Sequence, residues 1–133
     1  MTERTVLGES TRQLVDGRNF AVVATINPDG SPQTSVVWVG LDGDTVVFSS
    51  LTSRRKTRNL ARDPRISLTI LDSEDPYHTV EIRGTAELTD DPDKELPRTL
   101  SLKYTGEEPP PEPADMPRSI VRVIPEKVIP FKV

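Results

Sequence analysis

The sequence predicts a mainly β protein, a small antiparallel barrel with short helices packed outside it. Three observations lead to this class. Short runs of β-branched residues recur along the 133-residue chain, turn-forming residues separate them, and only two or three segments have helical composition. Antiparallel connections between short strands are typical of a closed or partly open barrel. We therefore expect six or seven strands in a single domain spanning residues 1–133.

The first half of the chain predicts one helix and three strands. Residues 5–16 mix apolar and polar positions and lead to a glycine, which indicates a short helix. A β-branched run at 20–26 follows, and the Asn-Pro-Asp-Gly sequence at 27–30 predicts a turn, because proline presets φ and glycine accepts left-handed backbone. Runs at 33–41 and 45–50 are separated by an Asp-Gly pair. Together the three runs predict an antiparallel meander.

The middle of the chain changes character. Residues 53–63 contain strong helix formers, with Ser53 at the expected N-cap and Pro64 just beyond the end. Strands are expected at 65–71 and 79–88.

The last third begins with a segment, 91–104, that predicts a helix broken or kinked at Pro97. Residues 107–117 hold five prolines and predict an extended surface loop within the domain. Two short strands, 119–124 and 127–132, are expected to end the chain on either side of a Pro-Glu pair.

Composition excludes several classes of function. The net charge of −4 and the isoelectric point near 5.0 disfavour nucleic-acid binding. The chain has no cysteine and a single histidine, His78, so we expect no metal site and no disulfide. No long apolar run begins the chain, which predicts a cytoplasmic protein without a membrane span. The hydrophobic content of 34% is low, which favours burial of apolar surface against a second copy.

A basic cluster marks the start of the predicted 53–63 helix. Its members are Arg54, Arg55, Lys56 and Arg58. A helix N-terminus presents free N–H groups and partial positive charge, so cations there repel it unless an anion is bound. Hydroxyl groups of Ser49 and Ser50, from the preceding strand, add neutral donors. The pattern indicates a phosphate held by Arg55 and Lys56. The alternative is a solvated basic face paired with some of the 21 acidic residues.

A second candidate stretch lies in the run 33–41. Strand geometry places Thr34, Val36 and Trp38 on one face, with Ser35 and Val37 on the other. A half-polar strand beside the basic helix could line a planar ring system. The alternative is that Trp38 simply fills the core.

Other catalytic signatures are weak. Tyr77 and His78 precede a strand, and a lone histidine beside an aromatic residue is more often structural than catalytic. The chain contains no nucleophile elbow, no dinucleotide-binding glycine motif and no P-loop.

The order of these motifs resembles a known family. The sequences Asn-Pro-Asp-Gly-Ser-Pro, Val-Val-Trp-Val, Val-Val-Phe-Ser-Ser and Ser-Arg-Arg-Lys-Thr-Arg-Asn-Leu-Ala-Arg-Asp-Pro-Arg occur in succession. They resemble the pyridoxamine 5′-phosphate oxidase-like split β-barrel superfamily, and in particular its small actinobacterial branch of F420-dependent flavin/deazaflavin oxidoreductases, which includes biliverdin reductase-like members. The resemblance implies a split barrel that forms a homodimer and shares each cofactor site between two subunits.

The resemblance also implies roles for individual residues. Ring and ribityl contacts fall on Thr34, Ser35, Val36, Val37 and Trp38. Contacts to the ribityl chain and phosphate fall on Ser49, Ser50, Arg55 and Lys56, with Asn59 behind them, and Tyr77 to Thr79, including His78, are candidates for the wall supplied by the partner subunit. The chain lacks the longer C-terminal segment of true pyridoxamine phosphate oxidases, and Phe131 stands where many relatives have tryptophan, so pyridoxamine phosphate is not the expected substrate.

The implied activity is hydride transfer from reduced coenzyme F420 to a conjugated small molecule, such as a biliverdin-type tetrapyrrole, a quinone or an enone. FMN is the alternative cofactor, because it shares the tricyclic ring, ribityl chain and phosphate. The anionic tail of F420 would suit Arg54, Arg58 and Arg62. A third reading is a non-catalytic flavin-, deazaflavin- or haem-binding module, with His78 as a haem ligand.

Overall fold

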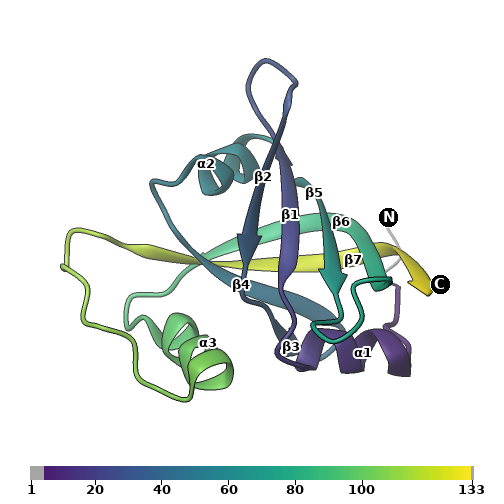
Figure 1. Ribbon diagram of the computed structural model, residues 1–133. Helices are drawn as coiled ribbons and strands as arrows, with labels where there is room; N and C mark the ends of the chain where they lie inside the picture. Colours follow the sequence, from purple (N-terminus) through teal and green to yellow (C-terminus); the bar gives the residue numbers. More distant parts are fainter. Residues whose placement is uncertain (1–4, 133) are drawn as a thin grey trace.

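The structure is a computed structural model that describes residues 5–132, and a seven-stranded antiparallel sheet forms its centre (Figure 1). The strands are β1 (Ala21–Ile26), β2 (Pro32–Val37), β3 (Gly40–Asp42), β4 (Thr45–Leu51), β5 (Arg65–Leu71), β6 (His78–Asp90) and β7 (Arg118–Lys132). Their order in the sheet is β2-β1-β5-β6-β7-β4-β3. The predicted mainly β class with helices outside the sheet is confirmed.

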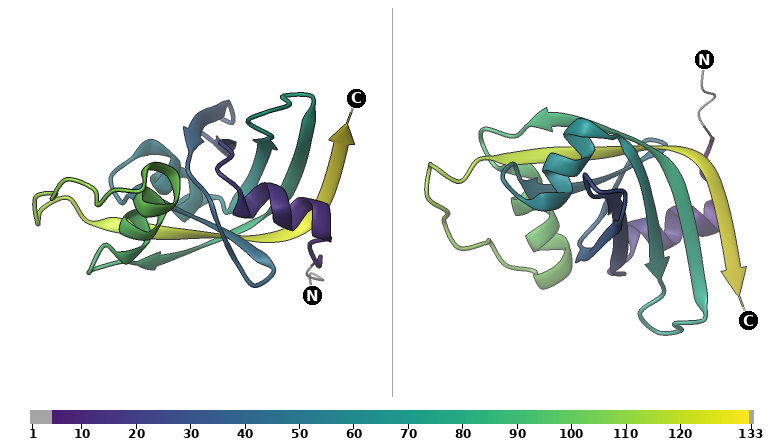
Figure 2. Two further views of the ribbon diagram at one scale, coloured as in Figure 1. Left: turned by 60° about the horizontal axis from the view of Figure 1, so that its bottom comes forward. Right: turned by 90° about the horizontal axis from the view of Figure 1, so that it is seen from above.

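Three helices accompany the sheet: α1 (Glu9–Asp16), α2 (Arg55–Arg62) and α3 (Glu95–Thr105). Figures 1 and 2 show α3 and the proline-rich loop, residues 107–117, extending from one end of the curved sheet, while α1 packs at the other end. No helix within the described residues is long and apolar enough to cross a membrane.

The core lies inside the curve of the sheet. Burial alternates along β1 and β5, as expected for strands with one face toward the core. The largest side chains with under 2% exposure include Phe48, Leu68, Ile70 and Ile82. Burial of such side chains contributes about 1.5–3 kcal/mol each. The packed core therefore fixes the positions of the strands, and with them the residues at the strand ends.

The predicted three-stranded meander is wrong, because the run 33–41 breaks at Trp38 and Val39. Its first part, β2, pairs with β1, whereas its second part, β3, pairs with β4 at the opposite edge of the sheet. The break follows from tertiary contacts. The backbone N–H of Val39 donates to the Tyr104 hydroxyl at 3.2 Å, and its carbonyl accepts from the Lys103 amine at 2.7 Å. Two side chains of α3 thus replace the strand partner of Val39.

Helix boundaries differ from the predicted ones at their N-terminal ends. The first helix begins at Glu9, after an extended stretch in which Thr5 bonds to β7. The second has Arg54 rather than Ser53 at its N-cap, with no side-chain capping bond. The third begins only at Glu95, so Pro97 lies in its first turn. Proline is tolerated there because its missing N–H would have no helical partner. The predicted break at Pro97 is therefore wrong.

The predicted interruption of the last strand is also wrong. Strand β7 continues through Pro125, because β6 makes a register shift between Arg83 and Gly84 that sets Gly84 opposite Pro125. A Cβ atom on Gly84 would clash with the backbone carbonyl of Ile124. Glycine is thus required for β6 and β7 to approach at the bend.

Candidate functional site

A cavity of about 810 Å³ is lined by residues of β2, β4, the start of α2, α3 and the proline-rich loop. Three groups of residues line it. The β2 strip consists of Ser35, Val36, Val37 and Trp38. The α2 wall consists of Ser49, Ser50, Leu51, Arg54 and Lys56. The loop wall consists of Lys94, Pro97, Arg98, Leu100, Ser101, Pro109, Pro110, Pro111, Glu112 and Arg118.

The β2 strip combines an aromatic surface with an unsatisfied hydroxyl. Trp38 is 36% exposed and stacks on Tyr104, with ring centroids 5.2 Å apart and planes 8° from parallel. The indole therefore lies at the cavity and does not fill the core. The buried Ser35 Oγ has no hydrogen-bond partner among the described residues. A buried polar atom without a partner costs about 1–3 kcal/mol, so this hydroxyl suits a polar group of a ligand.

The α2 wall carries positive charge without carboxylate partners. Lys56 is half-buried, and burial lowers the pKa of its amine, helped by the charges of Arg54 and Arg118. Within the described chain, neither Arg54 nor Lys56 forms an ion pair. Thr57 holds the helix to the strand, since its hydroxyl bonds both Ser50 Oγ and the Leu51 carbonyl at 2.8 Å. This wall is suited to bind an anion.

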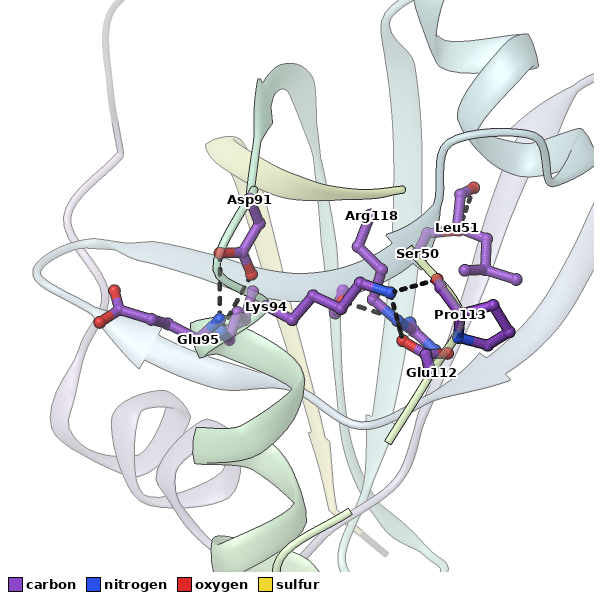
Figure 3. A network of polar contacts seen from close by, with 10 residues as sticks. Ser50, Leu51, Asp91, Lys94, Glu95, Glu112, Pro113 and Arg118 are labelled. Atoms are coloured by element: carbon purple, nitrogen blue, oxygen red, sulfur yellow. Dashed lines mark hydrogen bonds and ion pairs between the residues drawn. The ribbon is translucent and has the colours of Figure 1, made fainter. Parts of the chain in front are cut away.

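On the loop wall the cations are paired (Figure 3). Arg118 donates to both carboxylate oxygens of Glu112, at 2.8 and 2.9 Å, and to Ser49 Oγ at 3.3 Å. Lys94 Nζ lies 3.4 Å from Glu112 and donates to the Pro113 carbonyl at 3.3 Å. The Arg118 hydrogen bonds, followed by the charges of Arg118 and Lys94, lower the pKa of Glu112 to about 2.

A second ion pair joins the loop to α3 farther into solvent. Arg98 Nε bonds both carboxylate oxygens of Glu108, at 2.9 and 2.8 Å, with side chains 63% and 56% exposed. Exposed pairs of this kind contribute about 0–1 kcal/mol. The two ends of the loop are held by bonds to the carbonyls of Glu107 and Pro117, and its middle is attached mainly through Glu112.

The structure brings together seven of the twelve residues predicted to bind the cofactor. Those lining the cavity are Ser35, Val36, Val37, Trp38, Ser49, Ser50 and Lys56. Those outside its lining are Thr34, Arg55, Asn59, Tyr77 and His78.

Arg55 and Lys56 line different cavities. Arg55 lines a separate hollow with Pro28, Asp29 and other residues of the β1–β2 turn. Helical geometry explains the separation, because adjacent residues of a helix project about 100° apart.

Asn59 is fully buried, and its amide donates to Thr25 Oγ1 and Asn27 Oδ1, both at 3.0 Å. Its side chain attaches α2 to β1. Asn59 does not line the cavity, and it affects the cavity only by fixing the position of α2.

Tyr77 and His78 lie at the turn between β5 and β6. His78 Nδ1 is 3.1 Å from an Asp72 carboxylate oxygen, and Tyr77 is 65% exposed. Neither residue lines the cavity. The contact predicted for them would require a second copy of the chain.

Sequence reasoning missed Lys94, Arg98, Glu112 and Arg118 as site residues. They occur in no recognisable motif, and Arg118 reaches Ser49 across 69 positions of the chain. The available signals were the acidic residues of the proline-rich segment and the isolated arginine that follows it.

Comparisons with known proteins agree with this fold. The family described as pyridoxamine 5′-phosphate oxidase matches residues 7–132. A solved F420 reductase is 29% identical over 92% of this chain and 98% of its own, with a TM-score of 0.84. A conserved hypothetical protein from Mycobacterium tuberculosis is 23% identical over 98% and 90% of the two chains, with a TM-score of 0.76. HupZ of Group A Streptococcus is 18% identical over 96% and 95%, with a TM-score of 0.72. The last two likenesses show the fold alone.

Proposed function

The chain belongs to the pyridoxamine 5′-phosphate oxidase family, whose split-barrel fold it shares, and on that premise we propose that it is an oxidoreductase binding a phosphate-bearing deazaflavin or flavin. Coenzyme F420 is the favoured cofactor, and FMN is the alternative. The proposal includes a cytoplasmic homodimer in which the partner supplies the opposite wall of each site. Exposed apolar side chains such as Val36 on the edge strand β2 support such an interface.

The observation that carries the proposal is the orphaned Ser35 hydroxyl, in a cavity that is also lined by Trp38 and by Lys56, which has no ion-pair partner among the described residues. An aromatic surface and a buried donor suit a planar, polar-edged ring. The hydroxyls of Ser49 and Ser50 with the Lys56 amine suit a phosphate. A volume of about 810 Å³ lies within the size range of small-molecule sites.

When bound, the cofactor would supply the hydride chemistry, and the chain supplies binding, orientation and electrostatics. Ser35 would hydrogen-bond a polar edge of the ring, and Trp38 would limit its tilt. Lys56 would neutralise the phosphate. The proline-rich loop would limit access of water to the cavity. We propose a conjugated small molecule, of the tetrapyrrole, quinone or enone type, as the acceptor reduced in this site.

F420 is favoured over FMN for two reasons. The likeness to an F420 reductase extends over nearly the whole chain. In addition, five cations line the cavity, and two of them, Arg54 and Lys56, have no carboxylate partner among the described residues, so that one is left for the anionic tail when the other binds the phosphate. Of the arginines predicted to meet the F420 tail, only Arg54 is among them; Arg62 instead donates to the Ile26 carbonyl. Contacts from Thr34, Arg55, Asn59, Tyr77 and His78 remain predictions.

Cofactor binding can be measured through Trp38, the only tryptophan of the chain. Titration with F420 should quench its emission more strongly at low concentration than titration with FMN. Lys56→Ala should weaken F420 binding about tenfold, or about 1.4 kcal/mol, as expected for a charge-assisted hydrogen bond. Arg58→Ala is the matched control, since Arg58 lies on the same helix but lines neither cavity. Absence of quenching by both cofactors would contradict the proposal, and tighter FMN binding would reverse the ranking.

Turnover separates an enzyme from a storage protein. Reduced F420 should be oxidised in the presence of the chain and a quinone, an enone or biliverdin, as measured by the return of deazaflavin absorbance. Tight cofactor binding without oxidation by any acceptor would instead support the hypothesis of a non-catalytic cofactor-binding protein.

A further inference from the structure

We propose that Glu112 determines how many anionic groups the cavity accepts, because its carboxylate occupies the position between Lys94 and Arg118 that a second anionic group of a ligand would take. Such a group must displace Glu112 and thereby open the proline-rich loop. The inference deepens the proposed function and rests on it in one respect, namely that the natural ligand bears a phosphate.

The charges that line the cavity place Glu112 in competition with an anionic ligand. Among the described residues that line the cavity, Glu112 is the only carboxylate, and it pairs with two of the five lining cations. Arg118 uses two nitrogens on Glu112 and the third on Ser49 Oγ. Ser49 also belongs to the wall proposed to hold the phosphate. A ligand with anions at both places would therefore compete with Glu112 for the same guanidinium.

The backbone conformation of Lys94 directs its amine toward Glu112. Lys94 has φ 53° and ψ 42°, and it is the one non-glycine residue with positive φ in the described part of the chain. This left-handed conformation costs about 1–2 kcal/mol. Asp91 holds it in place: its carbonyl accepts from the Lys94 N–H at 3.0 Å, and its carboxylate caps the first two N–H groups of α3 (Figure 3). The strained turn aims the Lys94 amine at Glu112 and Pro113.

The composition of the proline-rich loop leaves it with few backbone N–H donors. Five of its eleven residues are prolines, which have no N–H to donate. Backbone carbonyls at its two ends, those of Glu107 and Pro117, accept from Ser101 Oγ and from the Thr52 N–H. Between those ends the loop depends on side-chain contacts, namely those of Glu112, one Lys94 bond to the Pro113 carbonyl and the exposed Arg98–Glu108 pair. Loss of the Glu112 contacts should therefore release the middle of the loop from the cavity.

Loop position can be measured without any cofactor. The chain has no cysteine, so Pro110→Cys provides a unique site for a bimane label. Pro110 and Trp38 line the same cavity, so Trp38 quenches the label while the loop is closed. Glu112→Gln should raise bimane emission at least about twofold, because a charge-assisted bidentate contact is lost. Glu108→Gln is the matched control on the same loop, and it should leave the emission near the parent value.

Inorganic anions test the selectivity. In the labelled parent protein, pyrophosphate should raise bimane emission at lower concentration than orthophosphate at the same ionic strength. Isothermal titration calorimetry compares the affinities of the two proteins, because the bimane emission of Glu112→Gln is already high without an anion. Glu112→Gln should tighten pyrophosphate binding about tenfold and orthophosphate binding about threefold or less, because only the first ligand engages both walls.

Two results would overturn the inference. One is a Glu112→Gln protein with unchanged bimane emission and unchanged pyrophosphate affinity. The other is weaker pyrophosphate binding, which would mean that Glu112 orients Arg118 for the ligand and does not compete with it. Failure of F420 and FMN to bind the unaltered protein would contradict the proposed function alone, because neither anion measurement uses them.

Discussion

The two charged walls of the cavity contain similar residues in opposite states. On the α2 wall, Arg54 and Lys56 have no carboxylate partner among the described residues. On the loop wall, Lys94 and Arg118 share Glu112, and Arg98 binds Glu108. The difference teaches that the number of basic residues does not give the capacity of a site for anions. What counts is the charge left after internal pairing.

The local sequence explains part of this difference. No acidic residue occurs between positions 45 and 62, so the α2 wall has no nearby chain neighbour to neutralise it. The proline-rich segment carries Glu107, Glu108 and Glu112 just before Arg118. Paired and unpaired cations therefore derive from segments of opposite composition, which the fold brings to one cavity.

The largest expected effect comes from breaking the support of the α2 wall. Asn59→Ala removes a buried amide and leaves the polar atoms of Thr25 and Asn27 without a donor. We expect a loss of about 2–3 kcal/mol in the free energy of unfolding. Urea denaturation followed by circular dichroism measures it. Arg58→Ala, at an exposed position of the same helix, should change stability by less than about 0.5 kcal/mol. Equal losses for both variants would show that Asn59 does not anchor the helix.

A smaller effect isolates the strain on the loop wall. Lys94→Ala and Lys94→Gly both remove the ion pair with Glu112, but only glycine accepts positive φ without cost. We expect the glycine variant to be more stable than the alanine variant by about 1 kcal/mol. Thermal unfolding of the two proteins, compared at the same pH, measures the difference. An alanine variant as stable as the glycine variant would show that the turn carries no strain.

At low pH, protonation of Glu112 should leave Lys94 and Arg118 of the loop wall without a carboxylate partner, as the cations of the α2 wall are at neutral pH. The pKa of Glu112 is depressed from 4.5 to about 2 by Arg118 and Lys94, so its contribution to loop closure is complete above pH 4.5 and is lost as the pH falls toward 2. Bimane emission from the Pro110→Cys label should rise through this interval, while circular dichroism reports whether the barrel is intact. In the Glu112→Gln background the emission should already be high and should change little with pH. A parallel rise in both proteins would assign the transition to other carboxylates.

Much of the fold was predictable from the sequence, and the predictions that were wrong have physical reasons. The strands at 20–26, 45–50 and 65–71 were placed within about one residue, because β-branched runs and turn residues act locally. The hairpin at the Asp-Gly pair was placed correctly, since β3 pairs with β4. The continuity of the run 33–41 was mispredicted, because nothing near Val39 indicates that Lys103 and Tyr104 will take its backbone groups. The α2 side of the site could be read for the same local reason, since Ser49, Ser50 and Lys56 lie within eight positions of one another.

By itself, the sequence determined where strands and turns occur and where unpaired positive charge would gather, because backbone preference and side-chain alternation depend on residues a few positions apart. Only the tertiary structure decided that β2 and β3 lie at opposite edges of the sheet, that Arg55 turns away from Lys56, and that Glu112 reaches Lys94 and Arg118. Those outcomes depend on hydrogen bonds and charges between segments far apart in the chain. Such partners have no local signature, because it is the packing of the barrel that brings them within bonding distance.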